Sequence, residues 1–184
     1  MNDMNTLIIH PEDSSTDFLK KIYKNLENKN VIRRGVGKDE VGELIKSHDR
    51  CFLMGHGTPN GLMSLGMFKD SWGFIVDSNM VSSLINQKDN MYIWCYAKSF
   101  VERQNLHGLY TDMFISEVGE AFYHGLINVS KEEVNESNDV FGHLVGENIH
   151  KSNEEIHQIL KTEYTRFGKN NRIAKFNSKR IFIR

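Results

Sequence analysis

Two short apolar segments of this chain each lead into a residue that can take part in thiol chemistry. Residues 51–55 run directly into His56, and residues 91–94 run directly into Cys95. Cys95 offers a sulfur nucleophile, and an imidazole beside it favours the thiolate and can later protonate a leaving amine. The two residues therefore predict nucleophilic acyl transfer if the fold brings them together.

Both apolar segments are expected to be buried strands, because they are short, rich in β-forming residues and bounded by polar residues. If the two strands are parallel neighbours, His56 and Cys95 emerge together at their carboxyl ends. Open α/β sheets place their chemistry at that edge. The catalytic interpretation thus depends on one structural expectation, the adjacency of these two strands.

The same two segments resemble the signature of the caspase-like cysteine peptidases, the clan of caspases, gingipains, clostripain and legumain. In that family a hydrophobic strand ends in His-Gly, and a second hydrophobic strand ends in the nucleophilic Cys. The matching stretches here are Phe-Leu-Met-Gly-His-Gly at 52–57 and Tyr-Ile-Trp-Cys-Tyr-Ala at 92–97. The resemblance extends over about residues 5–128. The Gln-Ala-Cys-x-Gly pentapeptide of true caspases is absent, so a bacterial relative is the better comparison and cleavage after Asp is not implied.

The resemblance implies a cysteine endopeptidase with a His-Cys dyad. Cys95 attacks the peptide carbonyl, the backbone N–H groups of Gly57 and Cys95 hold the oxyanion, and His56 protonates the leaving amine. Water then hydrolyses the acyl-enzyme. The family usually operates without a third residue, and the sequence does not choose among the residues that could orient the imidazole. These candidates are Asn60, Asp112 and Glu117.

The resemblance also indicates where substrate specificity arises. In the family, the loop after the first strand and the segment after the nucleophile line the pocket for the residue before the cut. The candidates in these segments are Asp13, Ser15, Asp17, Asp112, Ser116 and Glu117. An acidic pocket favours Arg or Lys, since a buried carboxylate needs a cationic partner. The alternative is that residues 13–17 only cap the following helix.

Both catalytic candidates also have structural interpretations. Free Cys is among the most buried residue types, and His56 could simply end a strand. Gly55 and Gly57 favour function, because glycines let the chain turn sharply and let a substrate approach closely. Two other functions stay open: a catalytically silent caspase-like binding module, and a flavodoxin-like domain that binds a nucleotide or small molecule at the same strand ends.

The alternation of apolar strands and amphipathic helices predicts an α/β three-layer sandwich, with a mostly parallel central sheet and helices on both faces. One domain is expected over residues 1–184. Strands are expected at 6–10, 31–34, 51–55, 91–94, 109–115 and 180–184, with a hairpin of 62–64 and 74–76 outside the main sheet. Helices are expected at 18–26, 39–47, 78–85, 97–104 and 117–123, followed by a helical segment at about 130–166.

Composition and charge limit the cellular location and the partners that can be expected. The chain has 184 residues and a formal net charge of −1, and no apolar run approaches a membrane span. No secretory signal is visible at the amino terminus, so a cytoplasmic location is expected. Nine Lys or Arg residues stand against three Glu in residues 151–184, but they are scattered among apolar residues. A peptide or protein substrate is therefore expected rather than nucleic acid.

The two cysteines are expected to be free thiols, because the predicted strands hold them at different levels of the sheet, too far apart for a disulfide. Cys51 is expected to be a small buried apolar residue. The histidines show neither His-x3-His spacing nor a Cys-x2-Cys partner motif. Neither a metal nor a cofactor is expected, and the sequence does not indicate an oligomeric state.

Overall fold

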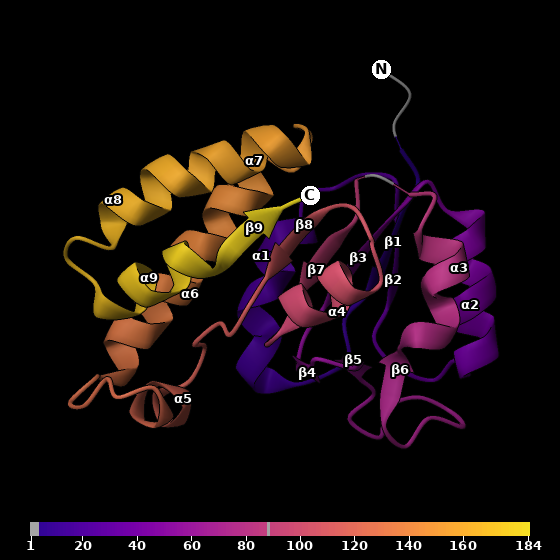
Figure 1. Cartoon of the computed structure of the whole chain (residues 1–184), viewed down its shortest axis with the longest axis horizontal. Helices are drawn as coiled ribbons and strands as arrows, with labels where there is room; N and C mark the ends of the chain where they lie inside the picture. Colours follow the sequence, from indigo (N-terminus) through magenta and orange to yellow (C-terminus); the bar gives the residue numbers. More distant parts are fainter. Residues whose placement is uncertain (1–3, 88) are drawn as a thin grey trace.

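The computed structural model describes residues 4–87 and 89–184, which form an α/β fold of three layers (Figure 1). The central sheet has six strands in the order β2-β1-β3-β7-β8-β9. The first five are parallel, and β9 runs antiparallel to β8. Their bounds are Thr6–Ile9 (β1), Lys29–Ile32 (β2), Arg50–Met54 (β3), Met91–Ile93 (β7), Leu109–Thr111 (β8) and Ile181–Ile183 (β9). The predicted fold class is confirmed.

The strand adjacency on which the catalytic interpretation depends is present. β3 and β7 are parallel neighbours, with Leu53 opposite Tyr92 and Met54 opposite Ile93. The Gly55 amide donates to the Ile93 carbonyl at 3.0 Å and extends this pairing by one residue. The chain segments that follow the two strands therefore leave the sheet at the same edge.

Helices cover both faces of the sheet, which explains why its strands read as continuous apolar runs. On β3, Leu53 faces one apolar core and Phe52 faces the other, and both are fully buried. The first core is closed by α2 (Lys38–Ser47), α3 (Val81–Leu84) and α4 (Ala97–Arg103). The second is closed by α1 (Lys20–Tyr23), α6 (Lys131–Glu147), α7 (Asn153–Ile159) and the π-helical turn Leu160–Tyr164.

The predicted hairpin outside the main sheet is also present. β5 (Gly61–Met63) pairs antiparallel with β6 (Phe74–Val76), and β4 (Gly57–Thr58) joins them as a third strand. β4 begins at the residue after His56, so the chain leaves the central sheet directly into this smaller one, which lies below it in Figure 1.

The helix expected at 18–26 differs most from prediction. The segment begins earlier, as a 3-10 turn at Ser14–Leu19 called η1, and its α-helical part α1 ends at Tyr23. The Asp13 side chain caps η1 by accepting a hydrogen bond from the Ser15 amide. The helical segment therefore starts closer to the amino terminus than predicted, because the Asp13 side chain caps a turn that begins at Ser14.

The final third is helical before the closing strand, as expected. α6 begins at the Ser130 cap, and α7 begins at the capping box of Ser152 and Glu155. The remaining helices are α5 (Val118–Tyr123), α8 (Thr165–Phe167), α9 (Arg172–Asn177) and the 3-10 turns at Ser78–Met80 and Ser178–Arg180. Helix α9 was not predicted; its one sequence signal is the capping Asn171.

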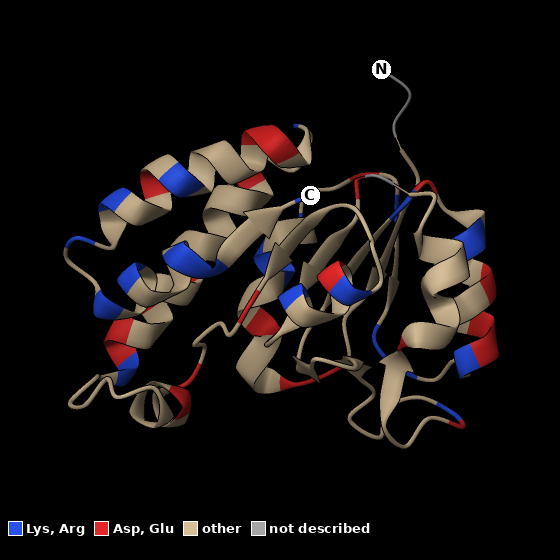
Figure 2. Ribbon diagram, in the orientation of Figure 1, with Lys and Arg blue, Asp and Glu red and all other residues tan. Residues whose placement is uncertain are grey.

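Lys and Arg residues of the last third are distributed over the π-helical turn, α8, α9 and the segments that flank them, and α7 carries none (Figure 2). Acidic residues on α7 and in the π-helical turn interrupt this basic character. Within residues 4–87 and 89–184, no helix is both long and apolar enough to cross a bilayer.

Candidate active site

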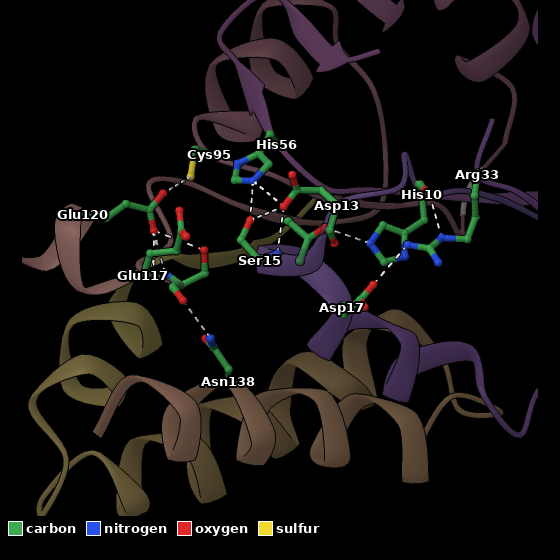
Figure 3. A network of polar contacts seen from close by, with 12 residues as sticks. His10, Asp13, Ser15, Asp17, Arg33, His56, Cys95, Glu117, Glu120 and Asn138 are labelled. Carbon is green, nitrogen blue, oxygen red and sulfur yellow. Dashed lines mark hydrogen bonds and ion pairs between the residues drawn. The ribbon is translucent and has the colours of Figure 1, made fainter. Parts of the chain in front are cut away.

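His56 and Cys95 lie together at the carboxyl edge of the sheet. Both line a narrow space of about 20 Å³, together with Phe114 and other residues, and both line an open groove of about 520 Å³. Figure 3 shows the imidazole with Cys95 on one side and with Asp13 and Ser15 on the other. The structure thus brings together the two residues that the sequence selected.

A sharp turn between β7 and α4 presents Cys95 at the surface. Trp94 at the end of the strand is 2% exposed, whereas Cys95 is half-buried. The next residue, Tyr96, adopts the left-handed region with φ 67° and immediately precedes α4. Because of this turn, the Cys95 side chain is less buried than the strand residues that precede it. Cys51 is also a free thiol but is fully buried within β3, as expected.

The Cys95 thiol faces acceptors other than the imidazole. Its Sγ atom lies 3.5 Å from the Phe114 carbonyl oxygen and 3.9 Å from a carboxylate oxygen of Glu120, and its S–H group can donate to either. Burial, together with the Glu120 charge, raises the pKa of Cys95 to about 12. Cys95 is therefore a protonated thiol at neutral pH. The thiolate that an adjacent base would favour is not present before a substrate binds.

His56 is oriented by the loop that follows β1. Its Nε2 lies 2.7 Å from the Ser15 hydroxyl and 3.5 Å from the Asp13 carboxylate, and the Ser15 hydroxyl is also hydrogen-bonded to Asp13. A carboxylate only accepts, so Ser15 donates to Asp13 and accepts from Nε2–H of the imidazole. In a neutral His56, Nδ1 is then the unprotonated nitrogen. The ring can act as a base through Nδ1 while Ser15 and Asp13 hold Nε2.

None of the three residues considered for orienting His56 makes this contact. Asn60 accepts a hydrogen bond from Arg103, Asp112 accepts one from the Met113 amide, and Glu117 takes part in the capping box of α5. The orienting pair is instead Asp13 and Ser15, which the sequence suggested for specificity. Only the folding of η1 against the end of β3 brings this pair to the ring.

Asp13 combines the capping role with the contact to His56. Hydrogen bonds from Ser15, assisted by His56, lower the pKa of Asp13 below its ordinary value, so the group is a carboxylate at neutral pH. The capping interpretation is therefore correct for Asp13, and the same carboxylate also faces the imidazole. Asp13 is not among the residues that line the polar cavity described next.

A polar cavity of about 690 Å³ lies between η1 and α6. It contains four of the six residues suggested for specificity and shares Phe18 and Ser116 with the narrow space at His56 and Cys95. Its ionisable or hydroxyl-bearing lining residues are Ser14, Ser15, Asp17, Lys21, Ser116, Glu117, Lys131 and Asp139. Asp112, like Asp13, lies outside this lining. Asp17 is already paired with Lys20 at 2.7 Å and with Arg33 at 3.1 Å.

Gly57, the expected oxyanion donor, lies in the open groove with Cys95. A Cβ atom at this position would stand 2.0 Å from the Trp94 ring, so no other residue fits without rearrangement. The backbone of Gly57 can therefore lie close to the end of β7. Its role as a donor stays a prediction.

A buried histidine that the sequence did not single out supports the orienting loop. His10, at the end of β1, contacts the Tyr23 hydroxyl at 2.9 Å through Nδ1 and the Thr16 hydroxyl at 3.1 Å through Nε2. Thr16 itself donates to the Asp13 carbonyl. Burial, then the Arg33 charge, lowers the pKa of His10 to about 4, so the ring is neutral at pH 7. His10 thus links β1 to the turn that carries Asp13 and Ser15.

In the part of the chain that the structure describes, no group of three or more His, Cys, Asp or Glu side chains could hold a metal ion. Comparison of the chain with models of protein families, with curated proteins and with solved structures gives no match. The functional argument therefore rests on the residues and their geometry.

Proposed function

We propose that this protein is a cysteine endopeptidase of the caspase-like type, with His56 and Cys95 as its dyad. One observation carries the proposal. Parallel neighbours β3 and β7 end at one edge of the sheet, and the residues that follow them line a common open groove. A base and a thiol at adjacent strand ends form the arrangement that nucleophilic catalysis needs.

The geometry supports the following reaction. Nδ1 of His56 accepts the thiol proton as Cys95 Sγ attacks the peptide carbonyl carbon, and the backbone amides of Gly57 and Cys95 donate to the oxyanion. Each such donor contributes about 3 kcal/mol in acyl transfer. The C–N bond then breaks, and Nδ1–H protonates the leaving amine. Water attacks the thioester with His56 again as base, which releases the acid and restores the thiol.

The raised pKa of Cys95 constrains this mechanism. A thiol with a pKa of about 12 reacts slowly with small electrophiles at neutral pH, because the thiolate is the reactive species. We expect proton transfer to His56 to accompany substrate binding, which excludes water and places the carbonyl at Sγ. The reaction rate with iodoacetamide therefore does not separate an active enzyme from a silent one.

Cleavage after Arg or Lys is the specificity that the polar cavity supports best. Three carboxylates line it, those of Asp17, Glu117 and Asp139, against the two ammonium groups of Lys21 and Lys131. The excess of one negative charge favours a cationic substrate side chain, and Ser116 connects this cavity to the catalytic pair. Asp17 and Asp139 already have basic partners, so Glu117 is the carboxylate best placed to contact a guanidinium or ammonium group.

A second candidate function is a regulated or catalytically silent module that binds peptides through the same groove. The observation in its favour is the thiol itself, which is hydrogen-bonded to Phe114 and Glu120 rather than to His56. A silent module would bind peptides at this site and would not transfer their acyl groups to sulfur.

The deciding experiment uses peptidyl electrophiles that carry Arg, Lys, Asp or Asn at the reactive end, with intact mass spectrometry as the readout. We expect an adduct on Cys95 with the Arg and Lys probes and strongly reduced labelling in His56→Ala. Cys51→Ser is the matched control and should label like the original protein. Binding of all four peptides without any adduct would favour the silent module, and labelling that is indifferent to His56→Ala would end the dyad mechanism.

A further inference from the structure

The open groove beside the catalytic pair has a different character from the polar cavity. Near the dyad it is lined by His56, Gly57, Cys95 and Glu120. Apart from His124, its other lining residues are apolar or aromatic and come from four separate segments of the chain. These apolar or aromatic residues are Met63, Leu65, Tyr96, Met113 and Tyr123. We refer to this space of about 520 Å³ as the apolar groove.

The polar cavity, the catalytic pair and the apolar groove form a continuous series. The narrow space at the dyad shares Phe18 and Ser116 with the polar cavity, and it shares His56 and Cys95 with the apolar groove. A peptide whose carbonyl carbon lies at the Cys95 sulfur would therefore have chemically different surroundings on the two sides of the cleaved bond.

Two residues that line the apolar groove have an unusual backbone conformation. Among the residues that the structure describes, five non-glycine residues have positive φ. Three are Asp or Asn, which tolerate the left-handed region. The other two are Leu65 with φ 53° and Tyr96 with φ 67°, and both line the apolar groove. Bulky residues persist in this conformation only where the surroundings impose it, and such positions cluster at functional sites.

The surroundings of both residues are well defined. Tyr96 stands between the nucleophile and α4, and its carbonyl accepts the Ser99 amide at 3.1 Å. Leu65 follows Ser64, whose fully buried hydroxyl donates to the Ser71 carbonyl at 2.7 Å. The two side chains are thus held at the groove by fixed turns on either side of it, so the groove exists before a substrate arrives.

We propose that the apolar groove binds a large apolar side chain of the substrate, on the leaving-amine side of the cleaved bond. This inference rests on the proposed peptidase function. If a basic residue on the acyl side occupies the polar cavity, a chain that crosses Cys95 continues into the apolar groove. Two methionines among its lining residues allow it to adapt to side chains of different shape. The Glu120 carboxylate at its inner end disfavours an acidic residue there.

The test uses four peptides that share Arg before the cleaved bond and carry Phe, Leu, Gly or Asp directly after it. Cleavage sites and kcat/KM are measured by liquid chromatography and mass spectrometry. We expect the Phe and Leu peptides to exceed the Gly peptide by about tenfold or more, the range of discrimination in apolar pockets, and the Asp peptide to be the poorest substrate.

A matched pair of glycine variants tests the groove itself. Leu65→Gly removes the side chain while placing glycine where φ is positive, which glycine adopts without strain, so folding should be retained. Its preference for Phe over Gly should fall to about threefold or less. Asp70→Gly makes the same type of backbone change at φ 54°, outside the groove lining, and should keep the full preference.

Failure of this inference is distinguishable from failure of the proposed function. Cleavage of all four peptides at similar rates, or an apolar preference confined to the acyl side, would overturn the apolar groove as a leaving-side site while preserving the peptidase. An unchanged preference in Leu65→Gly would also overturn it. Absence of both cleavage and labelling of Cys95 by the Arg electrophile would overturn both proposals.

Discussion

At the scale of single residues, Glu120 affects the protonation state of the Cys95 thiol. One of its carboxylate oxygens lies 3.9 Å from the Cys95 sulfur, and the other accepts hydrogen bonds from the Ser116 and Glu117 amides. The same side chain thus shapes the segment 116–117 and opposes formation of a thiolate. Its negative charge is the second contribution to the raised pKa of Cys95, after burial.

Replacing this charge should activate the thiol. Glu120→Gln should lower the pKa of Cys95, because it removes the charge and leaves burial as the main cause of the shift. Glutamine also satisfies a capping box, so α5 should be retained. We expect labelling by iodoacetamide at pH 8 to rise about threefold to tenfold, as a pKa decrease of up to about one unit implies. Glu136→Gln, an exposed position on α6, is the control.

Labelling rates measured between pH 7 and pH 10 test this prediction directly. An unchanged rate in Glu120→Gln would show that the carboxylate does not act on the sulfur. An equal increase in Glu136→Gln would attribute the effect to overall charge.

Ser15 is the second decisive residue, since it holds Nε2 of His56 at 2.7 Å. Ser15→Ala should lower kcat by about tenfold or more with little change in KM, because general-base catalysis contributes about 10²–10⁴-fold and requires an oriented ring. Ser15→Thr keeps the hydroxyl and should recover most of kcat. Recovery is the informative outcome: if both variants lose kcat equally, Ser15 does not position His56 through its hydroxyl.

At the scale of elements, the loop after β1 and the turn that follows it position His56. The loop is short, ends with Asp13, which caps η1, and is attached to the core through His10 and Thr16. Thr16 donates to the Asp13 carbonyl, so its oxygen accepts from Nε2–H of His10, and Nδ1 of His10 accepts from Tyr23. The bond from Tyr23 requires an unprotonated Nδ1, so this arrangement is that of the neutral imidazole.

This network makes stability depend on pH. The folded-state pKa of His10 is lowered to about 4 from 6.5, so the unfolded chain binds more protons between these values. The stabilisation is fully present above pH 6.5 and is lost as the pH falls toward 4, by about 3 kcal/mol in the free energy of unfolding. Urea titrations at several pH values should show this loss, and His10→Gln should flatten it.

His150→Gln, at an exposed position, is the matched control for that experiment and should keep the pH dependence of the original protein. The same slope in His10→Gln and in the original protein would mean that other groups cause the loss of stability in acid.

At the scale of the whole molecule, the carboxyl-terminal third is part of the site's support. Asn177, at the end of α9, is fully buried and forms two hydrogen bonds with the backbone of Ile115, at 2.8 and 2.9 Å. Ile115 lies between Phe114, whose carbonyl faces the Cys95 thiol, and Ser116, which lines the polar cavity. Residues more than 60 positions apart thus meet next to the segment that faces Cys95.

Removing this attachment should affect the entire molecule. Asn177→Ala leaves a buried N–H and a buried carbonyl of Ile115 without partners, which we expect to cost about 2–4 kcal/mol in the free energy of unfolding. Chemical denaturation measures the change, and Asn170→Ala, at an exposed position, should differ little from the original protein. A loss below 1 kcal/mol in Asn177→Ala would show that this segment is not essential to the fold.

The sequence alone determined most of the central strands and the positions of His56 and Cys95. Apolar runs bounded by polar residues identified β1, β3 and β7, because residues buried on both faces must be apolar along the whole strand. The positions of His56 and Cys95 at strand ends followed from the same runs, and the alternation of strand and helix predicted a mostly parallel sheet, while the adjacency of β3 and β7 was a condition that the tertiary structure met. These features are local or follow from general rules of sheet topology.

Only the tertiary structure decided what surrounds the pair. The partners of His56 are 41 and 43 positions away from it, and those of Cys95 are 19 and 25 positions away. Such contacts depend on how η1 and α5 pack against the sheet edge, and side-chain geometry of this kind leaves no periodic pattern in a single sequence. For the same physical reason the sequence suggested Asn60, Asp112 and Glu117 as orienting residues, while packing placed Asp13 and Ser15 there.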